Sequence, residues 1–372
     1  MELKKYFLPT KIIFGEKTFQ QLPAELKAAG VKKPLVICGK HFIPSLKFRV
    51  LQNALPFFRV FSGVEANPST ASVDEAAKML NELKCDSVIG IGGGSVLDAA
   101  KVVACMKGFT KGSEAFYGKM KISRAQRVPF FALPTTSGSG SEATPYSVLT
   151  LPSGEKKGLK FREFFAAVAI VDPELTTSMP PELTASSGID AFSQAVEAFW
   201  AKTSTPETDA FAKESIALSY QWLVKAVKVP DMQSRVMMAK ASLTAARAFS
   251  NTGTTACHTV SYAFTKHYGL AHGFAVAISV PWFLGFYSES KSKKTRDKCK
   301  EICSILGANS VPEAQEKIRA LLKSIGAPTR LSEIGCVRED FPKIIEMAAV
   351  NKPSNPRRHT TKDIERMLEE LY

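Results

Sequence analysis

The first half of the chain alternates short apolar segments with amphipathic ones. The apolar segments lie at residues 34–38, 87–91, 129–134 and 166–173, and all but the third contain several β-branched residues. The amphipathic segments include residues 73–83 and 97–106, where apolar side chains recur at helical spacing. Because strands that alternate with helices of this length are typical of a parallel sheet, the pattern predicts an α/β domain.

The pattern changes after Pro180-Pro181. Long stretches rich in Ala, Leu, Glu and Lys follow, and apolar runs with strand-like character become rare. This pattern predicts an all-helical domain over residues 181–372, behind an α/β domain over residues 1–180. A chain of 372 residues is also long enough for two domains with a cleft between them.

Composition narrows the class of protein. With 45% hydrophobic and 23% charged residues the chain has the make-up of an ordinary globular protein, and no apolar stretch reaches the roughly 18–20 residues needed to cross a bilayer. Its first residues lack the apolar core of a secretory signal, so we expect a cytoplasmic protein without membrane contact. Seven cysteines without a CxxC pair argue against disulfides or a cysteine zinc site.

The net charge of +14 raises the question of nucleic-acid binding. Basic residues are spread along the chain, and the densest run lies at residues 291–300. We interpret that run as a solvated helix face and expect no nucleic-acid partner. A diffuse positive potential would attract an anionic cofactor or substrate.

A glycine-rich loop follows the apolar segment at residues 87–91. The residues Gly92-Gly93-Gly94-Ser95 stand between this expected strand and the helix that begins near residue 97. Consecutive glycines let backbone N–H groups approach a phosphate, and a helix N-terminus favours the same negative charge. The loop therefore predicts a pyrophosphate site. A tight turn without a ligand is the alternative, and Leu97 stands where the GxGxxG pattern has its last glycine.

A second polar loop, residues 135–142, follows the next expected strand. It interleaves Thr135, Thr136 and Ser139 with glycines, and small hydroxyl side chains of this kind can hydrogen-bond a ribose or phosphate. A flexible linker is the alternative. Two such loops at the carboxyl ends of neighbouring strands would lie where open α/β sheets bind ligands.

The helical half contains a candidate metal site. His258 and His272 are 14 residues apart, about 21 Å on one continuous helix, so they can share an ion only if the chain reverses near Gly269. Asp190 and Gln194 lie one helical turn apart elsewhere. Together the four side chains are a workable ligand set for a divalent first-row metal. Histidines satisfied within a core are the alternative.

At this point the sequence resembles the iron-containing (group III) alcohol dehydrogenases. The resemblance rests on motifs along nearly the whole chain: Phe14-Gly15, Asn67–Thr70, Gly92–Ser95 with Asp98 and Lys101, Pro134–Glu142, Val171–Leu175, Gly188–Ala191, His272-Gly273 and Asn355–Arg357. It implies an N-terminal dinucleotide-binding domain, an all-α C-terminal domain, and a divalent metal, Fe²⁺ or Zn²⁺, with the cofactor in the cleft between them.

The resemblance also assigns roles to residues. It makes Asp190, His258 and His272 metal ligands, with Gln194 where the family usually has a histidine ligand and Tyr262 where many members have a histidine associated with proton transfer. We therefore treat Asp190, His258, His272 and Tyr262 as the catalytic set. The expected cofactor-binding residues are Gly39, Lys40, Asn67, Gly92, Gly93, Gly94, Ser95, Asp98, Thr135, Thr136, Ser139 and Lys160.

At Gln194 and Tyr262 this chain departs from the usual family residues. In both departures it is similar to a branch of the family, the phosphonoacetaldehyde and sulfoacetaldehyde reductases. This similarity implies reduction of a two-carbon aldehyde with an acidic head group to its primary alcohol, by hydride transfer from a nicotinamide. Candidate partners for that anion are Lys160, Arg162, Arg247 and Arg357. The alternatives are a general short-chain alcohol dehydrogenase and, if Gln194 prevents metal loading, a cofactor-binding protein without catalysis. The family suggests a homodimer or larger homo-oligomer.

The choice of cofactor depends on the end of the strand at residues 34–38. An acidic residue there would bind a ribose 2′-hydroxyl and repel a 2′-phosphate, whereas Gly39 leaves room and Lys40 offers positive charge. This favours NADPH over NADH.

Overall fold

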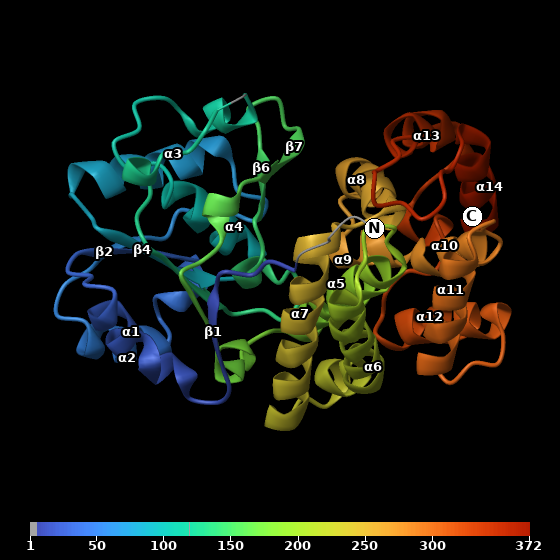
Figure 1. Cartoon of the computed structure of the whole chain (residues 1–372), viewed down its shortest axis with the longest axis horizontal. Coiled ribbons are helices and arrows are strands. Elements are labelled where there is room, and N and C mark those ends of the chain that lie inside the picture. The colour runs from blue at the N-terminus through green and yellow to red at the C-terminus, as the bar shows by residue number, and fades with distance from the viewer. Residues whose placement is uncertain (1–5, 119) are drawn as a thin grey trace. The chain divides into compact units, whose positions relative to one another are not determined.

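The computed structural model describes residues 6–118 and 120–372, which belong to two compact units (Figure 1). The sheet unit comprises residues 8–136 and 140–178, and the helical unit comprises residues 179–372 with residues 137–139 and the segment that ends at Phe7. Because of these two short pieces, the division of the chain differs from the single boundary expected at residue 180. Backbone contacts explain them: a Cβ at Gly138 would lie 2.5 Å from the Ser187 carbonyl oxygen, and the Phe7 amide donates to Asn251 Oδ1 at 2.8 Å.

A six-stranded sheet forms the centre of the sheet unit, in the order β1-β8-β5-β4-β2-β3. Its strands are β1 (Lys11–Phe14), β2 (Pro34–Cys38), β3 (Arg59–Phe61), β4 (Ser87–Gly92), β5 (Phe130–Pro134) and β8 (Val168–Val171). Every neighbouring pair is parallel, so the predicted parallel α/β domain is confirmed.

Helices cover both faces of this sheet. On one face α3 (Thr70–Glu82) and α4 (Gly94–Val103) pack against side chains such as Val88, and on the other α1 (Leu22–Ala28) and α2 (Leu46–Ala54) pack against the next residue of β4, Ile89 (Figure 1). Successive strand residues enter different cores because strand side chains alternate. Burial on both faces explains why these strands are continuous apolar runs in the sequence.

A two-stranded antiparallel sheet, β6 (Tyr146–Thr150) with β7 (Lys156–Lys160), was not predicted. Lys101 and Asp98 on α4 hold the chain that enters it. The Lys101 ammonium, fully buried, donates to the carbonyl oxygens of Ser141, Thr144 and Tyr146 at 2.6–3.2 Å. Asp98 accepts from the Ser141 hydroxyl and the Val148 amide. The hairpin thus depends on charged side chains from a distant helix, which no local pattern reveals.

The helical unit contains ten α-helices among its described residues. They are α5 (Pro181–Trp200), α6 (Pro206–Lys228), α7 (Met232–Thr252), α8 (Ala256–Tyr268), α9 (His272–Ala277), α10 (Val280–Ser288), α11 (Lys293–Ile305), α12 (Val311–Ser324), α13 (Phe341–Ala348) and α14 (Thr361–Leu371). Helix α5 is buried at 15 of its 20 residues and contacts α6, α7 and α9. At Gly188 a Cβ would lie 2.3 Å from Leu223 Cδ1, so only glycine permits this approach of α5 to α6.

Two further observations bear on the class of protein. No helix in the described part of the chain is both long and apolar enough to cross a membrane. All seven cysteines are free and buried, which agrees with their interpretation as small hydrophobic side chains.

Candidate metal and dinucleotide sites

A chain reversal between α8 and α9 brings two histidines together. Helix α8 ends at Tyr268, Gly269 adopts the left-handed conformation with φ 63°, and α9 begins at His272. A left-handed residue after the last turn favours glycine because other residues are strained there. The centroids of the His258 and His272 rings are consequently 5.4 Å apart. The break predicted at Gly269 is confirmed.

Asp190 on α5 completes a cluster with these two histidines. Its Oδ1 lies 3.7 Å from His258 Nε2 and 4.0 Å from His272 Nε2, and one ligand atom from each side chain lies within 4.8 Å of the others. Asp190 and His258 are buried, whereas His272 keeps an exposed side. Three potential ligand atoms therefore converge from three helices.

Gln194 lies one turn after Asp190 and contributes a fourth polar group. Its Nε2 donates to Asp190 Oδ2 at 2.9 Å, which leaves the amide oxygen free to accept. Gln194 Oε1 and Asp190 Oδ1 are both buried without a hydrogen-bond partner. Buried polar atoms without partners are costly, so two of them on residues one turn apart on α5 indicate a site that a ligand satisfies.

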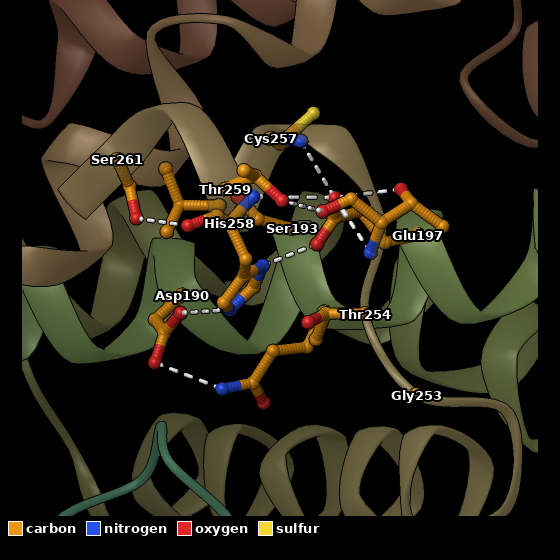
Figure 2. Close-up of polar contacts among 12 residues, drawn as sticks. Asp190, Ser193, Glu197, Gly253, Thr254, Cys257, His258, Thr259 and Ser261 are labelled. Atoms are coloured by element: carbon orange, nitrogen blue, oxygen red, sulfur yellow. Dashed lines mark hydrogen bonds and ion pairs between the residues drawn. The ribbon is translucent and has the colours of Figure 1, made fainter. Parts of the chain in front are cut away.

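Glu197, one further turn along α5, orients His258. The Glu197 carboxylate contacts His258 Nδ1 through Oε2, and its Oε1 accepts from the amides of Thr255, Cys257 and His258 at the start of α8 (Figure 2). The Thr255 hydroxyl donates to the same oxygen at 2.7 Å. A carboxylate on one ring nitrogen fixes the imidazole so that the other nitrogen faces the ligand cluster, as in many metal sites. Sequence reasoning gave Glu197 no role.

The two buried carboxyl groups of α5, Asp190 and Glu197, differ in their pKa. Burial raises the pKa of Asp190 to about 6, with His258 opposing and Glu197 adding to the rise. Burial also disfavours the Glu197 carboxylate, but His258 and the hydrogen bond to it outweigh that effect and hold its pKa at about 2. Glu197 is thus ionised at neutral pH, whereas His258 only partly offsets the cost of burying the charge of Asp190.

These residues fit a divalent metal. A first-row ion bonds to nitrogen and oxygen at about 2.0–2.2 Å, which sets tetrahedral ligand atoms about 3.4 Å apart. The 3.7 and 4.0 Å separations at Asp190 Oδ1 need only a small closure. A cation would also neutralise the buried Asp190 carboxylate and provide a partner for both orphaned oxygens.

Tyr262 lies one turn after His258 on α8, so both side chains share a face of the helix. The tyrosine is partly buried, and its pKa is raised by burial and by the Glu197 carboxylate. Its hydroxyl therefore keeps its proton at neutral pH.

The glycine-rich loop and the second polar loop meet at the carboxyl ends of β4 and β5 in the sheet unit. The Thr135 amide donates to the Gly92 carbonyl oxygen at 2.9 Å, and a Cβ at Gly93 would lie 3.3 Å from Thr136 Cγ2. Helix α4 starts at Gly94, so its N-terminus lies at this same edge of the sheet. Ser95 accepts from the Asn67 amide at 3.2 Å, which adds Asn67 to this group.

The other expected cofactor residues lie in several places, some of them at the same edge of the sheet. Gly39 and Lys40 directly follow β2, whose Cys38 pairs with Ile91 of β4, so they belong to the same sheet edge. Ser139 belongs to the helical unit.

Asp98 and Lys160 have partners within the sheet unit itself. The Asp98 carboxylate is occupied by Ser141 and Val148, and Lys160 on β7 holds its ammonium 5.2 Å from the centroid of the Tyr146 ring. Asp98 therefore has a structural role that its position beside the glycines concealed.

Comparisons with known proteins agree with this architecture. Residues 9–173 match the family "Iron-containing alcohol dehydrogenase", and residues 184–372 match the C-terminal domain of the Fe-containing alcohol dehydrogenase family. The chain is 31% identical to the NAD-dependent methanol dehydrogenase of Bacillus methanolicus, over 98% of this chain and 99% of that one. It is 33% identical to long-chain-alcohol dehydrogenase 1 of Geobacillus thermodenitrificans, over 95% and 92%.

Solved structures with the same fold include sulfoacetaldehyde reductase from Bifidobacterium kashiwanohense in complex with NAD⁺. That structure has a TM-score of 0.93 and 30% identity, covering 100% of this chain and 99% of that one. A 1,3-propanediol oxidoreductase has a TM-score of 0.90 and 28% identity, covering 100% of both chains. Fold and comparisons together define an oxidoreductase. The chain belongs to the iron-containing alcohol dehydrogenase family.

Proposed function

We propose that this enzyme is a metal-dependent aldehyde reductase that uses a nicotinamide dinucleotide. The observation that carries the proposal is the convergence of Asp190, His258 and His272, with two buried oxygens that lack partners. A divalent ion, Fe²⁺ or Zn²⁺, would be held by these three side chains and by Gln194 Oε1.

The residues of the chain would position the reactants. The chemistry that a bound divalent ion supplies is electrostatic stabilisation of the negative charge that grows on the aldehyde oxygen during hydride transfer. Glu197 holds the His258 ring so that Nε2 faces the ligand cluster. Gly93, Ser95 and the other loop residues would bind the pyrophosphate and ribose.

The reaction adds a hydride to the aldehyde carbon and a proton to its oxygen, giving the primary alcohol. Tyr262 is our candidate to supply the proton, because it lies one turn from His258 and stays protonated at neutral pH.

For the substrate we propose a two-carbon aldehyde with an acidic head group, phosphonoacetaldehyde or sulfoacetaldehyde. The similarity to a sulfoacetaldehyde reductase, at 30% identity, supports this choice. A general short-chain alcohol dehydrogenase is the second candidate, because relatives of similar identity are named for methanol and long-chain alcohols. For the cofactor, Gly39 and Lys40 favour NADPH. We also propose a homodimer or larger homo-oligomer, which light scattering would measure.

A substrate panel tests the proposal. Enzyme purified without chelator is analysed for metal and assayed with phosphonoacetaldehyde, sulfoacetaldehyde, butyraldehyde and lactaldehyde, each with NADPH and NADH. We expect about one equivalent of metal per site and the highest kcat/KM for an acidic aldehyde with NADPH. Comparable rates on the neutral aldehydes would support the second candidate, and metal-free protein without turnover would exclude both.

A further inference from the structure

Lys352 is a partly buried cation of the helical unit and has no role in the proposed mechanism. Lys352 lies in the segment between α13 and α14, and its ammonium donates to Thr254 Oγ1 at 2.9 Å. That is its one hydrogen bond to the described residues. An ammonium has three N–H donors, so two remain for another partner.

Lys352 is linked through Thr254 and Thr255 to Glu197, the carboxylate that contacts His258. Thr254 directly precedes Thr255, whose amide and hydroxyl both donate to Glu197 Oε1. The charges of Lys352 and Glu197 each shift the pKa of the other group. Lys352 therefore lies near the start of α8, the helix that carries His258, and Glu197 contacts that histidine.

The segment around Lys352 is fixed in place. Ser354 donates its hydroxyl to the Thr254 carbonyl oxygen at 2.6 Å, and its own carbonyl oxygen accepts from the Lys202 amide at 2.9 Å. The next residue, Thr203, donates its hydroxyl to the Thr252 carbonyl oxygen at 2.7 Å. A cation held in this way loses little conformational entropy when it binds an anion.

The basic residues that sequence reasoning offered for an anion are engaged elsewhere. Arg357 donates to the Phe286 carbonyl oxygen at 2.7 Å and stacks on the Phe286 ring at 3.8 Å. Arg247 stacks on the Phe211 ring, also at 3.8 Å. Lys160 holds its ammonium 5.2 Å from the centroid of the Tyr146 ring, and Arg162 also has a partner of its own. Lys352 keeps two N–H donors available and is linked through Thr254 and Thr255 to Glu197.

We propose that Lys352, anchored by Thr254, is the specificity-determining residue that binds the acidic head group of the aldehyde. Phosphonate and sulfonate groups are tetrahedral oxyanions that accept charge-assisted hydrogen bonds from an ammonium. In a two-carbon aldehyde the head group is separated from the carbonyl by one carbon, so its cation must stand beside the metal ligands. This inference rests on the proposed function.

A binding experiment tests the subsite without turnover. Ethylphosphonate and ethanesulfonate, which lack a carbonyl, are titrated by calorimetry into metal-loaded enzyme and its variants. We expect Lys352→Met to weaken binding at least roughly tenfold, the scale of one charge-assisted hydrogen bond. Lys352→Arg should retain binding within a few-fold. Lys352→Gln keeps a donor for Thr254 and serves if the methionine variant does not fold; it should lose binding equally.

The matched control is Lys291→Met, which removes one positive charge from an exposed position of the helical unit. It should bind both anions as the wild type does. Equal binding by wild type and Lys352→Gln, or no binding by wild type, would overturn the subsite.

Kinetics separates the subsite from the proposed function. For the acidic aldehydes we expect the loss of kcat/KM in the Lys352 variants to arise mainly in KM, and to exceed the loss for butyraldehyde at least roughly tenfold. Equal losses on acidic and neutral aldehydes would overturn the subsite and leave the reductase intact. If the wild type binds ethylphosphonate through Lys352 but reduces no acidic aldehyde, the proposed substrate is wrong and the subsite stands.

Discussion

The His258 ring shows how one carboxylate can orient an imidazole at a candidate metal site. Glu197 contacts Nδ1 and accepts hydrogen bonds from three backbone amides at the start of α8, so it fixes both the ring and the helix that carries it. Glu197→Gln keeps the size of the side chain but replaces its charge. We expect about 10- to 100-fold weaker metal binding, the usual effect of losing such a partner. Competition with a chromogenic chelator measures this.

The control for this prediction is Glu182→Gln, an exposed position in the first turn of the same helix. It should bind metal as the wild type does. Unchanged affinity in Glu197→Gln would show that the His258 ring is held by other contacts.

Gln194 offers a second test at the same site. Its amide oxygen is a neutral and weaker ligand than an imidazole nitrogen. Gln194→His should raise Zn²⁺ affinity by at least roughly tenfold, because even an outer hydrogen-bond partner has effects of that size. The same chelator competition applies, with Gln233→His, on the exposed side of α7, as the control. Unchanged affinity in Gln194→His would mean that the side chain at position 194 is not a ligand.

The site was partly predictable from single residues. Asp190, His258 and His272 could be selected because carboxylate and imidazole side chains are able to bind metals and a glycine allowed the chain to reverse. Glu197 could have been found as the third member of the set 190, 194 and 197 on one helix face, but an acid at that spacing is equally typical of a solvated face. Lys352 had no local signal, since tertiary contacts place it.

At the scale of elements, the contact between α9 and α5 depends on Gly273. A Cβ there would lie 1.8 Å from the Ser186 carbonyl oxygen, so Gly273→Ala forces the two helices apart. His272, the first residue of α9, would move away from Asp190. We expect a loss of about 1–3 kcal/mol in the free energy of unfolding and lower metal content after dialysis. Denaturant titration and elemental analysis measure both.

Gly158→Ala is the matched substitution, because a Cβ at Gly158 meets nothing within 4 Å and its φ is not positive. It should leave stability and metal content close to wild type. If Gly273→Ala behaves in the same way, α9 can adjust without disturbing the site.

The loop that precedes β6 contains a buried acid with a pH signature. Burial raises the pKa of Glu142 from 4.5 to about 7. The nearby Lys101 ammonium opposes this rise, but Lys101 also interacts with Asp98. Between these pH values the folded state binds more protons than the unfolded state, so stability decreases as pH rises from 4.5 to 7. Glu142→Gln removes this dependence.

The measurement is urea unfolding of wild type and Glu142→Gln at pH 4.5, 6 and 8. The stability of the wild type relative to the variant should decrease with rising pH by at most about 3 kcal/mol. A difference that is the same at all three pH values would contradict the burial of an ionisable Glu142.

At the scale of the whole molecule, the metal should stabilise one unit selectively. Asp190, Gln194, His258 and His272 all belong to the helical unit. A ligand at 100 times its Kd stabilises the state that binds it by about 2.7 kcal/mol. Removal of metal should therefore increase hydrogen exchange in α5, α8 and α9 and leave strands such as β4 unchanged. Equal increases in both units would contradict this expectation.

The fold was predictable where burial leaves a pattern. Strands β2, β4, β5 and β8 are apolar runs because helices cover both faces of the sheet, and α3 and α4 have one apolar side. Strands β1 and β3 are short and partly exposed at the two edges of the sheet, so no such run marks them. The β6–β7 hairpin depends on Lys101 and Asp98, which lie more than forty residues earlier in the chain.

Helix α5 has a consequence for how this enzyme can diversify. Neighbours enclose it, and it carries Asp190, Gln194 and Glu197 together, so most substitutions there would damage the chemistry and the packing at once. Thr254 and Lys352 lie on connecting segments outside it. Libraries that randomise these two positions should therefore yield variants with new aldehyde preferences, whereas libraries on α5 should yield mostly inactive protein.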